Sequence, residues 1–240
     1  MRKKEDEITC CKLVIYDIAC FLFCFSPSSV FKSISVDAFY GAFDELEIDF
    51  REVTEGFMKQ KNYVEVSVRG QGEHFMSVSR DWNIAFPYNY MTSSMEGPTE
   101  VEWMASDTFH EIITLPTYEW ILFNVNQFGF YRVKYDPGNW IALTKALKAN
   151  NSVFPDPTKA QLIDDALNFA KDGFLSYNIA FDLVMELERE TSFLTWNAAT
   201  KNLLHLNHLL GQSNIQPKFQ VSAFKALFIF FQFHETISIS

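Results

Sequence analysis

Cysteine is confined to one short stretch of this 240-residue sequence, and the rest of the chain has none. The four cysteines are Cys10, Cys11, Cys20 and Cys24. A disulfide-stabilised domain distributes its cysteines through the fold, so disulfides do not hold the body of this chain together. The spacing also lacks the paired C-x-x-C pattern of a zinc site, so we interpret these cysteines as small residues of an apolar segment.

Positive charge is also scarce, because 20 Lys and Arg residues stand against 30 Asp and Glu residues and the formal net charge is -10. A nucleic-acid-binding protein normally carries a basic stripe that neutralises phosphates, and this sequence has no such run. Nucleic acid is therefore not an expected partner. The chain is 48% hydrophobic, and its 25 Phe residues are typical of a large packed core or a broad interface.

Motifs for common enzyme chemistry are missing as well. The sequence has no G-x-S-x-G nucleophile elbow, no P-loop and no dinucleotide-binding fingerprint. The neighbouring carboxylates Asp164 and Asp165 suggest a catalytic pair. However, adjacent residues of a helix point about 100° apart, so the two are not expected to act together on one atom. We therefore predict a packing or inter-helix polar role for this pair.

Two apolar segments flank the body of the chain. Leu13–Phe25 is interrupted by Asp17, and its thirteen residues match a signal-peptide core but fall short of the roughly 20 residues that span a bilayer. The sequence leaves open a secretory signal, a signal anchor that attaches the chain to a membrane, or a buried or poorly ordered extension. Phe224–Phe233 is also too short to span a bilayer and is typical of a helix that lacks its packing partner.

Between residues 51 and 136 the sequence predicts a small β-sandwich. Tyr63–Arg69 alternates with period two, and Gly70–Gly72 is typical of a turn. Short strands at close intervals indicate this fold, and Asn126–Gly129 is expected to close its last hairpin. The other predicted strands are His74–Arg80, Asn83–Tyr90, Glu100–Ser106, Phe109–Thr114, Trp120–Val125 and Gly129–Tyr135.

From residue 137 onward the hydrophobic period is helical. In Thr158–Asp172 the apolar side chains share one face, with Thr158 as the expected N-cap and Gly173 as the expected C-cap. Antiparallel helices joined by short loops predict an α-helical hairpin array, the start of an α-solenoid. The fold class is therefore multi-domain, β then α. The other predicted helices are Asn139–Lys148, Ser176–Arg189, Ser192–Leu210 and Pro217–Phe233.

Several segments of the body form a recognisable ordered set. Trp120–Asp136 (WILFNVNQFGFYRVKYD) contains a Trp-containing strand, an Asn and a G-[FY]-Y-R-V-x-Y-D strand, and Lys159–Gly173 (KAQLIDDALNFAKDG) fits an R-A-Q-[LI]-I-D-D helix pattern. Leu175–Ala180 and Glu190–Ala199 continue in register, and Gln60–Val68 (QKNYVEVSV) is similar to a Q-K-G-Y-P-V-[VI]-x-V strand, with Val64 where Pro is usual. Together these segments resemble the aminopeptidase N family of zinc metallopeptidases.

The resemblance implies four parts in the chain. Residues 1–35 are an unmatched apolar N-terminal segment, and residues 36–50 form a helix that resembles the tail of the family's catalytic domain. Residues 51–136 correspond to the β-sandwich domain, and residues 137–240 correspond to part of the C-terminal helical domain. We therefore expect the chain to lack the family's catalytic domain.

Members of the family remove N-terminal amino acids from peptides, and zinc is the cofactor that the resemblance implies. Its two His ligands and a general-base Glu form an H-E-x-x-H motif on a helix. The nearest segment here, His110–Thr114 (HEIIT), has Thr in the second ligand position and lies in a predicted strand. Ser94–Gly97 (SMEG) has Gly where the family's G-x-M-E-N segment has Asn. We predict no catalytic residue, metal ligand or cofactor site in this chain.

Two further patterns are weaker. His205 and His208 lie three apart on a predicted helix, but no third ligand is near in sequence, so we interpret them as a half-exposed pair. Asn150-Asn151-Ser152 fits the N-glycosylation pattern in a predicted surface loop, which agrees with a luminal location.

These observations lead to two hypotheses. In the first, the chain is the non-catalytic portion of an aminopeptidase N-like peptidase, inactive by itself, and its missing partner is the catalytic domain. In the second, it is a stand-alone peptide- or protein-binding module derived from the family. Under either hypothesis we expect an exposed apolar patch. The resemblance indicates a membrane-associated or extracellular protein, and the sequence also leaves a cytoplasmic one open.

Overall fold

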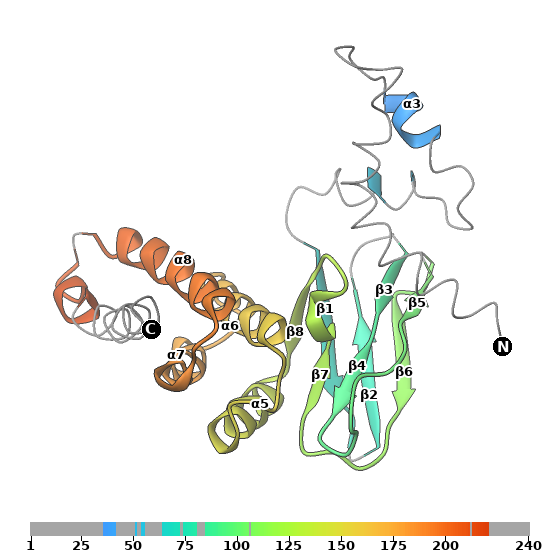
Figure 1. Ribbon diagram of the computed structural model, residues 1–240, viewed down its shortest axis with the longest axis horizontal. Helices are drawn as coiled ribbons and strands as arrows, with labels where there is room; N and C mark the ends of the chain where they lie inside the picture. Colours follow the sequence, from blue (N-terminus) through green and yellow to red (C-terminus); the bar gives the residue numbers. More distant parts are fainter. Residues whose placement is uncertain are drawn as a thin grey trace, which may run out of the picture. The chain divides into compact units, whose positions relative to one another are not determined.

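The computed structural model describes residues 36–41, 51, 54–55, 64–72, 74–80, 85–105, 107–211 and 213–220 (Figure 1). The chain divides into two compact units, residues 1–59 and residues 60–240. In the first unit the helix α3 (Val36–Gly41) begins where a helix was expected. The remainder of that expected helix, residues 1–35 with their four cysteines, and Phe224–Phe233 lie outside the described residues.

The second unit begins with small sheets, as the predicted fold class requires. The larger sheet consists of β1 (Glu65–Gly70), β2 (Phe75–Ser79), β6 (His110–Thr114) and β8 (Arg132–Tyr135). Its order is β6-β2-β1-β8, and β8 runs parallel to β1 while the other neighbours are antiparallel. Alternate side chains of β1, β2 and β8 point to one buried, apolar face, as a period of two dictates. These side chains are Val66, Val68, Met76, Val78, Val133 and Tyr135.

Four short strands form two further sheets. They are β3 (Phe86–Tyr88) with β5 (Glu102–Met104), and β4 (Tyr90–Thr92) with β7 (Ile121–Phe123). Aromatic rings pack between them: Tyr88 stacks on Phe123 at 5.2 Å between ring centroids. The hydroxyl of Tyr135, from the larger sheet, accepts a hydrogen bond from the Phe123 N–H at 2.8 Å. The apolar core and this bond join the sheets into the expected β-sandwich.

The predicted last hairpin is wrong. Although β7 and β8 follow each other in the sequence, β7 pairs with β4 and β8 pairs with β1. The connecting residues form the 3-10 helix η1 (Val125–Gln127), next to Asn124, whose φ is 60°. The Asn124 side chain accepts from the Gly129 N–H and donates to the Gly129 carbonyl, at 2.6 and 2.9 Å. Such a closed, left-handed loop turns the chain from one sheet to the other instead of reversing it.

One predicted strand is divided in the structure. Asn83–Tyr90 was expected to be continuous, but β3 ends at Tyr88 and β4 begins at Tyr90. Asn89 lies between them, and its carbonyl accepts a hydrogen bond from the Asn124 N–H at 2.9 Å. The chain changes its pairing partner at this residue, from β5 to β7. An alternating sequence pattern does not reveal such a change because the period continues through it.

A layer of helices follows the sheets (Figure 1). The elements are α5 (Pro137–Ala149), α6 (Asp156–Lys171), α7 (Tyr177–Met185), η2 (Glu186–Arg189) and α8 (Phe193–Leu209). The helix α6 is central, because it contacts both α7 and α8 and also reaches β8 and η1. None of the helices in the described ranges is long and apolar enough to cross a bilayer.

The ends of α6 only partly follow the sequence prediction. Gly173 has φ +80° just past the helix, where a left-handed residue ends many helices, so the expected stop is confirmed. Thr158 is not the N-cap, because the helix begins at Asp156. Instead Thr158 is buried, and its hydroxyl accepts a hydrogen bond from the Asn126 N–H at 2.9 Å. The tertiary contact between η1 and α6 therefore uses the side chain that was expected to cap the helix.

Candidate functional site

The His-Glu pair that most resembles a zinc motif lies on a strand. His110 and Glu111 belong to β6, an edge strand of the larger sheet, and Thr114 is its last residue. Consecutive side chains of a strand point to opposite faces. His110 and Glu111 therefore point to opposite faces, and His110 and Thr114, at the two ligand positions of the motif, are four residues apart along an extended strand instead of one helical turn apart. The prediction that this segment is a sandwich strand is confirmed.

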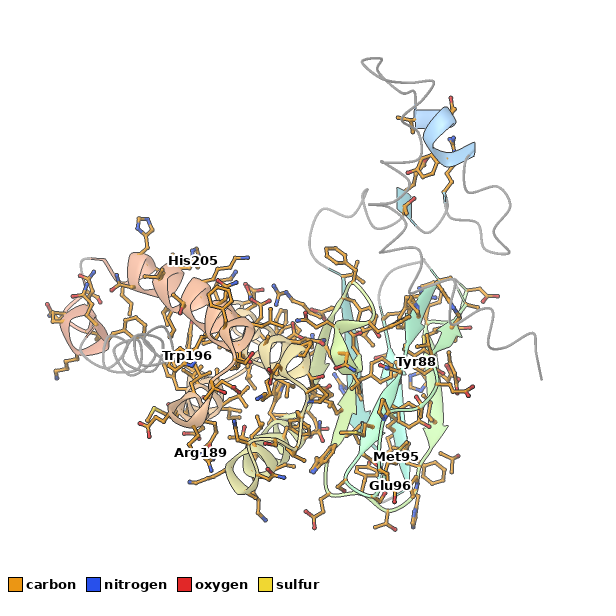
Figure 2. All side chains as sticks on the ribbon, viewed as in Figure 1. Tyr88, Met95, Glu96, Arg189, Trp196 and His205 are labelled. Carbon is orange, nitrogen blue, oxygen red and sulfur yellow. The ribbon has the colours of Figure 1, made fainter. Side chains whose placement is uncertain are left out.

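The other candidate ligands are also dispersed. Figure 2 shows Met95 and Glu96 in the loop at one end of the strands, following β4. His205 and His208 are exposed on α8, rather than half-exposed. Across the described ranges, no three His, Cys, Asp or Glu residues are grouped so that they could hold a metal ion.

The family's zinc therefore does not fit the residues that the structure describes. The sequence contains a second His-Glu pair, His234-Glu235, which lies outside the described residues. There the position of the second ligand is occupied by Ser238, as it is by Thr114 in the first pair. A hydroxyl is not among the usual protein ligands of zinc, which are thiolate, imidazole and carboxylate.

The strongest polar arrangement lies where the sheet meets the helices. Arg132, on β8, extends its side chain to the two carboxylates on α6. Its Nη1 atom lies 2.5 Å from Asp164 Oδ2 and 3.0 Å from Asp165 Oδ1. The prediction that the carboxylates cannot act on one atom is wrong, because the long arginine side chain reaches between them. The predicted polar packing role of the pair is confirmed.

The same arrangement extends to a third element. Asp164 Oδ1 accepts a hydrogen bond from Asn202 Nδ2, on α8, at 2.7 Å. Asn168, one turn after Asp164, donates to Asn202 Oδ1 at 3.1 Å. We call these five residues, Arg132, Asp164, Asp165, Asn168 and Asn202, the junction cluster. The cluster links a strand of the sandwich with two helices.

Asp165 is the most deeply buried carboxylate of the junction cluster, with 3% of the residue exposed. Burial raises its pKa to about 7, against the opposing effects of the Val133 N–H and of Arg132. The Val133 N–H donates to Asp165 Oδ2 at 2.9 Å. Burial alone lowers the pKa of Arg132, but Asp165 and Asp164 outweigh it and raise that pKa above its ordinary value. Arg132 is therefore charged at neutral pH.

A second buried ion pair holds α6 to the connection between η2 and α8. Lys159 Nζ lies 2.5 Å from Glu190 Oε2 and 2.9 Å from Asp156 Oδ1, and the side chains of Lys159 and Glu190 are only 6% and 4% exposed. The other oxygen of Glu190 accepts from the N–H groups of Thr191 and Ser192, each at 2.8 Å, at the start of α8. Burial lowers the pKa of Lys159, but the two carboxylates raise it overall.

An aromatic residue completes this second contact. Trp196 is buried on α8, and its indole N–H donates to the Glu190 carbonyl at 3.0 Å (Figure 2). The ion pair and the indole therefore fix the same short connection between η2 and α8 from two sides. We call Asp156, Lys159, Glu190 and Trp196 the helix clasp.

Sequence reasoning assigned no role to Arg132, Lys159, Glu190 or Asn202, although it quoted segments that contain the first three. A signal was present for Arg132, which is a charge within the apolar run of a predicted strand. A buried charge needs a partner of opposite charge. The Asp164-Asp165 pair was a candidate, because it is an acidic pair on the second helix predicted after the strand that carries Arg132. Spacing alone did not connect them, since 32 residues separate Arg132 from Asp164.

The polar groups of the junction cluster and the helix clasp hold secondary-structure elements in fixed positions. Their carboxylates accept hydrogen bonds from Arg132, Lys159, Asn202 and backbone N–H groups of the same unit. Removing one member of such a buried pair leaves the other charged and without compensation. Both groups therefore hold elements of this unit in place.

Comparison with known proteins identifies the region that carries both clusters. Residues 120–231 match the family model described as ERAP1-like C-terminal domain. Aminopeptidase N of Plutella xylostella is 36% identical over 145 residues, which are 58% of this chain. The chain is related to the aminopeptidase N family. Every residue of the junction cluster and the helix clasp lies within the matched range.

Other members of the aminopeptidase N family show the same partial coverage. The thyrotropin-releasing hormone-degrading ectoenzyme of Rattus norvegicus is 36% identical over 132 residues, or 55% of this chain. Human aminopeptidase N is 28% identical over 152 residues, or 60% of this chain. The matched part is 15% of the length of the Plutella protein, 12% of the rat protein and 16% of the human protein. The chain thus corresponds to a small share of these relatives.

Proposed function

We propose that this chain is the non-catalytic portion of an aminopeptidase N-like zinc metallopeptidase and that it is inactive by itself. In this proposal the sandwich and the helices act as a brace for a separate catalytic domain. The observation that carries the proposal is the junction cluster, which lies in the region related to the family. A brace has to keep the elements that it connects in fixed positions. A buried charged network between a sheet and two helices resists their separation.

The energetics of the junction cluster support a rigid brace. Breaking a buried ion pair by removing one partner typically costs about 3–5 kcal/mol, which is a large part of the stability of a domain. The helix clasp adds a second such pair, between α6 and the connection from η2 to α8. Moving α6 away from the sheet would have to break the junction cluster, and moving it away from the η2–α8 connection would have to break the helix clasp. The described part of residues 60–240 is therefore expected to behave as one body.

Exposed apolar side chains support a surface that another protein domain covers. Phe130, two residues before the strand that carries Arg132, is 85% exposed, and Phe174, three residues after the end of α6, is also exposed. Ile112 on the outer face of β6 is exposed as well. Exposed large apolar side chains are common at surfaces that contact another protein. The same residues would serve the second candidate function, a stand-alone peptide- or protein-binding module.

The first experiment tests inactivity. The purified chain is incubated with the chromogenic amides of Leu, Ala and Arg, with and without added zinc, and its metal content is measured by atomic emission. We expect no hydrolysis above the buffer rate and no zinc bound in a one-to-one ratio. Hydrolysis that follows zinc content would contradict the proposal.

The second experiment tests the brace. The chain is co-expressed with a fragment of the Plutella aminopeptidase N that lacks the corresponding segment, and the two are purified through a tag on the fragment. We expect co-purification and a gain of peptidase activity over the fragment alone. A chain that does not co-purify with the fragment but binds immobilised peptides would instead support the stand-alone module. A control chain carries Ile141→Ala, which replaces an exposed side chain on α5 away from both clusters.

A further inference from the structure

The loop between α5 and α6 carries the one Asn-x-Ser/Thr triplet in the 240-residue sequence, Asn150-Asn151-Ser152. In the secretory lumen such a triplet is the acceptor for N-linked oligosaccharide. Both Asn150 and Ser152 are exposed. The two side chains that the glycosylating enzyme must recognise therefore lie on the surface.

The local geometry orients the Asn150 amide. Asn150 follows the last turn of α5 in an extended conformation, with φ -148° and ψ 107°. Its side-chain oxygen accepts a hydrogen bond from the Ser152 N–H at 3.0 Å, which brings the Asn150 amide close to the residue two positions on. Within the described part of the chain, the amide nitrogen of Asn150 has no hydrogen-bond partner. The atom that would receive the sugar is thus unengaged.

The loop is anchored without covering Asn150. Phe154 is buried and packs edge-to-face on Trp120, with 5.0 Å between ring centroids. Asn151 donates through its amide nitrogen to the carbonyl of Arg189 at 3.3 Å, which ties the other side of the loop to η2. These two anchors turn Asn150 and Ser152 outward.

Buried asparagines of the same unit show the contrast. Asn139 donates to the Ile121 carbonyl and accepts from the Ile121 N–H, each at 2.8 Å, so both atoms of its amide are occupied. Asn124 uses both atoms of its amide on Gly129 in the same way. Asn150 differs from both because only its oxygen is engaged, and it alone of the three belongs to an acceptor triplet.

We propose that Asn150 is an N-glycosylation site of this chain. The co-reactant is an oligosaccharide carried on a polyisoprenyl diphosphate. The Asn150 amide nitrogen forms a bond to the anomeric carbon, and the bond from that carbon to the diphosphate oxygen breaks. The diphosphate leaves with the electron pair, and the amide nitrogen gives one proton to a base.

A glycan on Asn150 has a consequence for the proposed brace. The sugar would occupy the space beside the end of α5 and η2, so a catalytic domain cannot pack there. The contact surface of the brace must lie on other faces. The glycosylation itself does not depend on the proposed function, since it requires only that the chain enters the secretory lumen.

The experiment is translation of the full chain, preceded by an added cleavable signal peptide, in the presence of animal microsomes. Chains that resist externally added protease are separated by electrophoresis, with and without peptide-N-glycosidase F. We expect one slower band that the glycosidase returns to the position of the unmodified chain. A protected wild-type chain without such a band would overturn the proposal.

Matched variants locate the modification. Asn150→Gln and Ser152→Ala should each abolish the slower band, whereas Asn151→Gln keeps the triplet and should retain it. Ser152→Thr also keeps the triplet and should retain the band. Because oligosaccharide is added to the growing chain, the result does not require that a variant folds. A slower, glycosidase-sensitive band that persists in Asn150→Gln would assign the glycan elsewhere and overturn the proposal.

Discussion

The interior of the sandwich and the sheet–helix junction are held together by different forces. Inside the sandwich, apolar side chains from alternate positions of the strands meet, as with Tyr88 on Phe123. At the junction, Arg132 meets two carboxylates of α6. Apolar burial is non-directional and tolerates many neighbours, whereas a buried charge is stable only with a specific partner. The comparison indicates that the apolar pattern of the strands supports the sandwich, while the position of α6 against β8 depends in addition on a specific ion pair.

The largest expected effect is at an apolar contact between the sheet and α5. Trp140, on α5, is 1% exposed and packs edge-to-face on Tyr135. Trp140→Ala should lower the free energy of unfolding by about 3–5 kcal/mol, because a large cavity remains. Urea unfolding followed by circular dichroism measures it. The neighbouring control Ile141→Ala, at a side chain that is exposed, should stay within about 0.5 kcal/mol. Equal losses from the two variants would show that α5 does not pack as described.

The next largest effect is in the junction cluster. Arg132→Met keeps much of the side-chain length but removes the charge, and it should cost about 3 kcal/mol at pH 8, where Asp165 is mostly ionised. A second substitution, Asp165→Leu, should recover part of that loss, since it removes the unpaired carboxylate. Thermodynamic double-mutant cycles measure the coupling. Additive losses in the double variant would contradict the direct interaction between the two residues.

A smaller effect is the pH dependence of stability, which the junction cluster contributes and apolar packing does not. The pKa of Asp165 is about 7 in the folded chain and about 3.9 when unfolded, so the folded chain binds the proton more tightly. The stabilisation from this group is complete below about pH 4 and is lost as the pH rises through about 7. The slope for one proton is at most about 1.4 kcal/mol per pH unit.

The measurement for this prediction is the urea midpoint between pH 5 and pH 8. We expect Asp165→Asn to show a flatter profile than the wild-type chain over this range. Trp140→Ala should keep the wild-type slope because it changes no titrating group. A wild-type profile as flat as that of Asp165→Asn would mean that Arg132 keeps Asp165 ionised over this range.

The smallest effect is expected where the loop from the sandwich meets α6. Thr158→Val keeps the shape of the side chain but leaves the Asn126 N–H without its acceptor, which should cost about 1 kcal/mol. The matched control is Thr144→Val on α5, where the hydroxyl donates to a carbonyl that already belongs to the helix. A cost at Thr158 no greater than at Thr144 would argue against a specific contact between η1 and α6.

Much of the fold could be predicted because the signals are local. The period of two located strands such as β1 and β6, and the period of 3.6 located α5 and α8, to within a few residues. The prediction failed at Asn126–Gly129 because a left-handed loop and a hairpin turn use the same residue types. It failed at Thr158 because an N-cap and a buried hydroxyl look alike until the contact with Asn126 is known.

The amino-acid sequence by itself determined the order of β and α elements, the apolar face of each one, and the likeness to the aminopeptidase N family. These depend on periodicity and on ordered motifs, which a chain carries before it folds. Only the tertiary structure decided that β8 runs beside β1, that Arg132 lies between Asp164 and Asp165, and that Lys159 meets Glu190. Such contacts join residues that are far apart in the chain, and which distant residues meet follows from the packing of the whole unit.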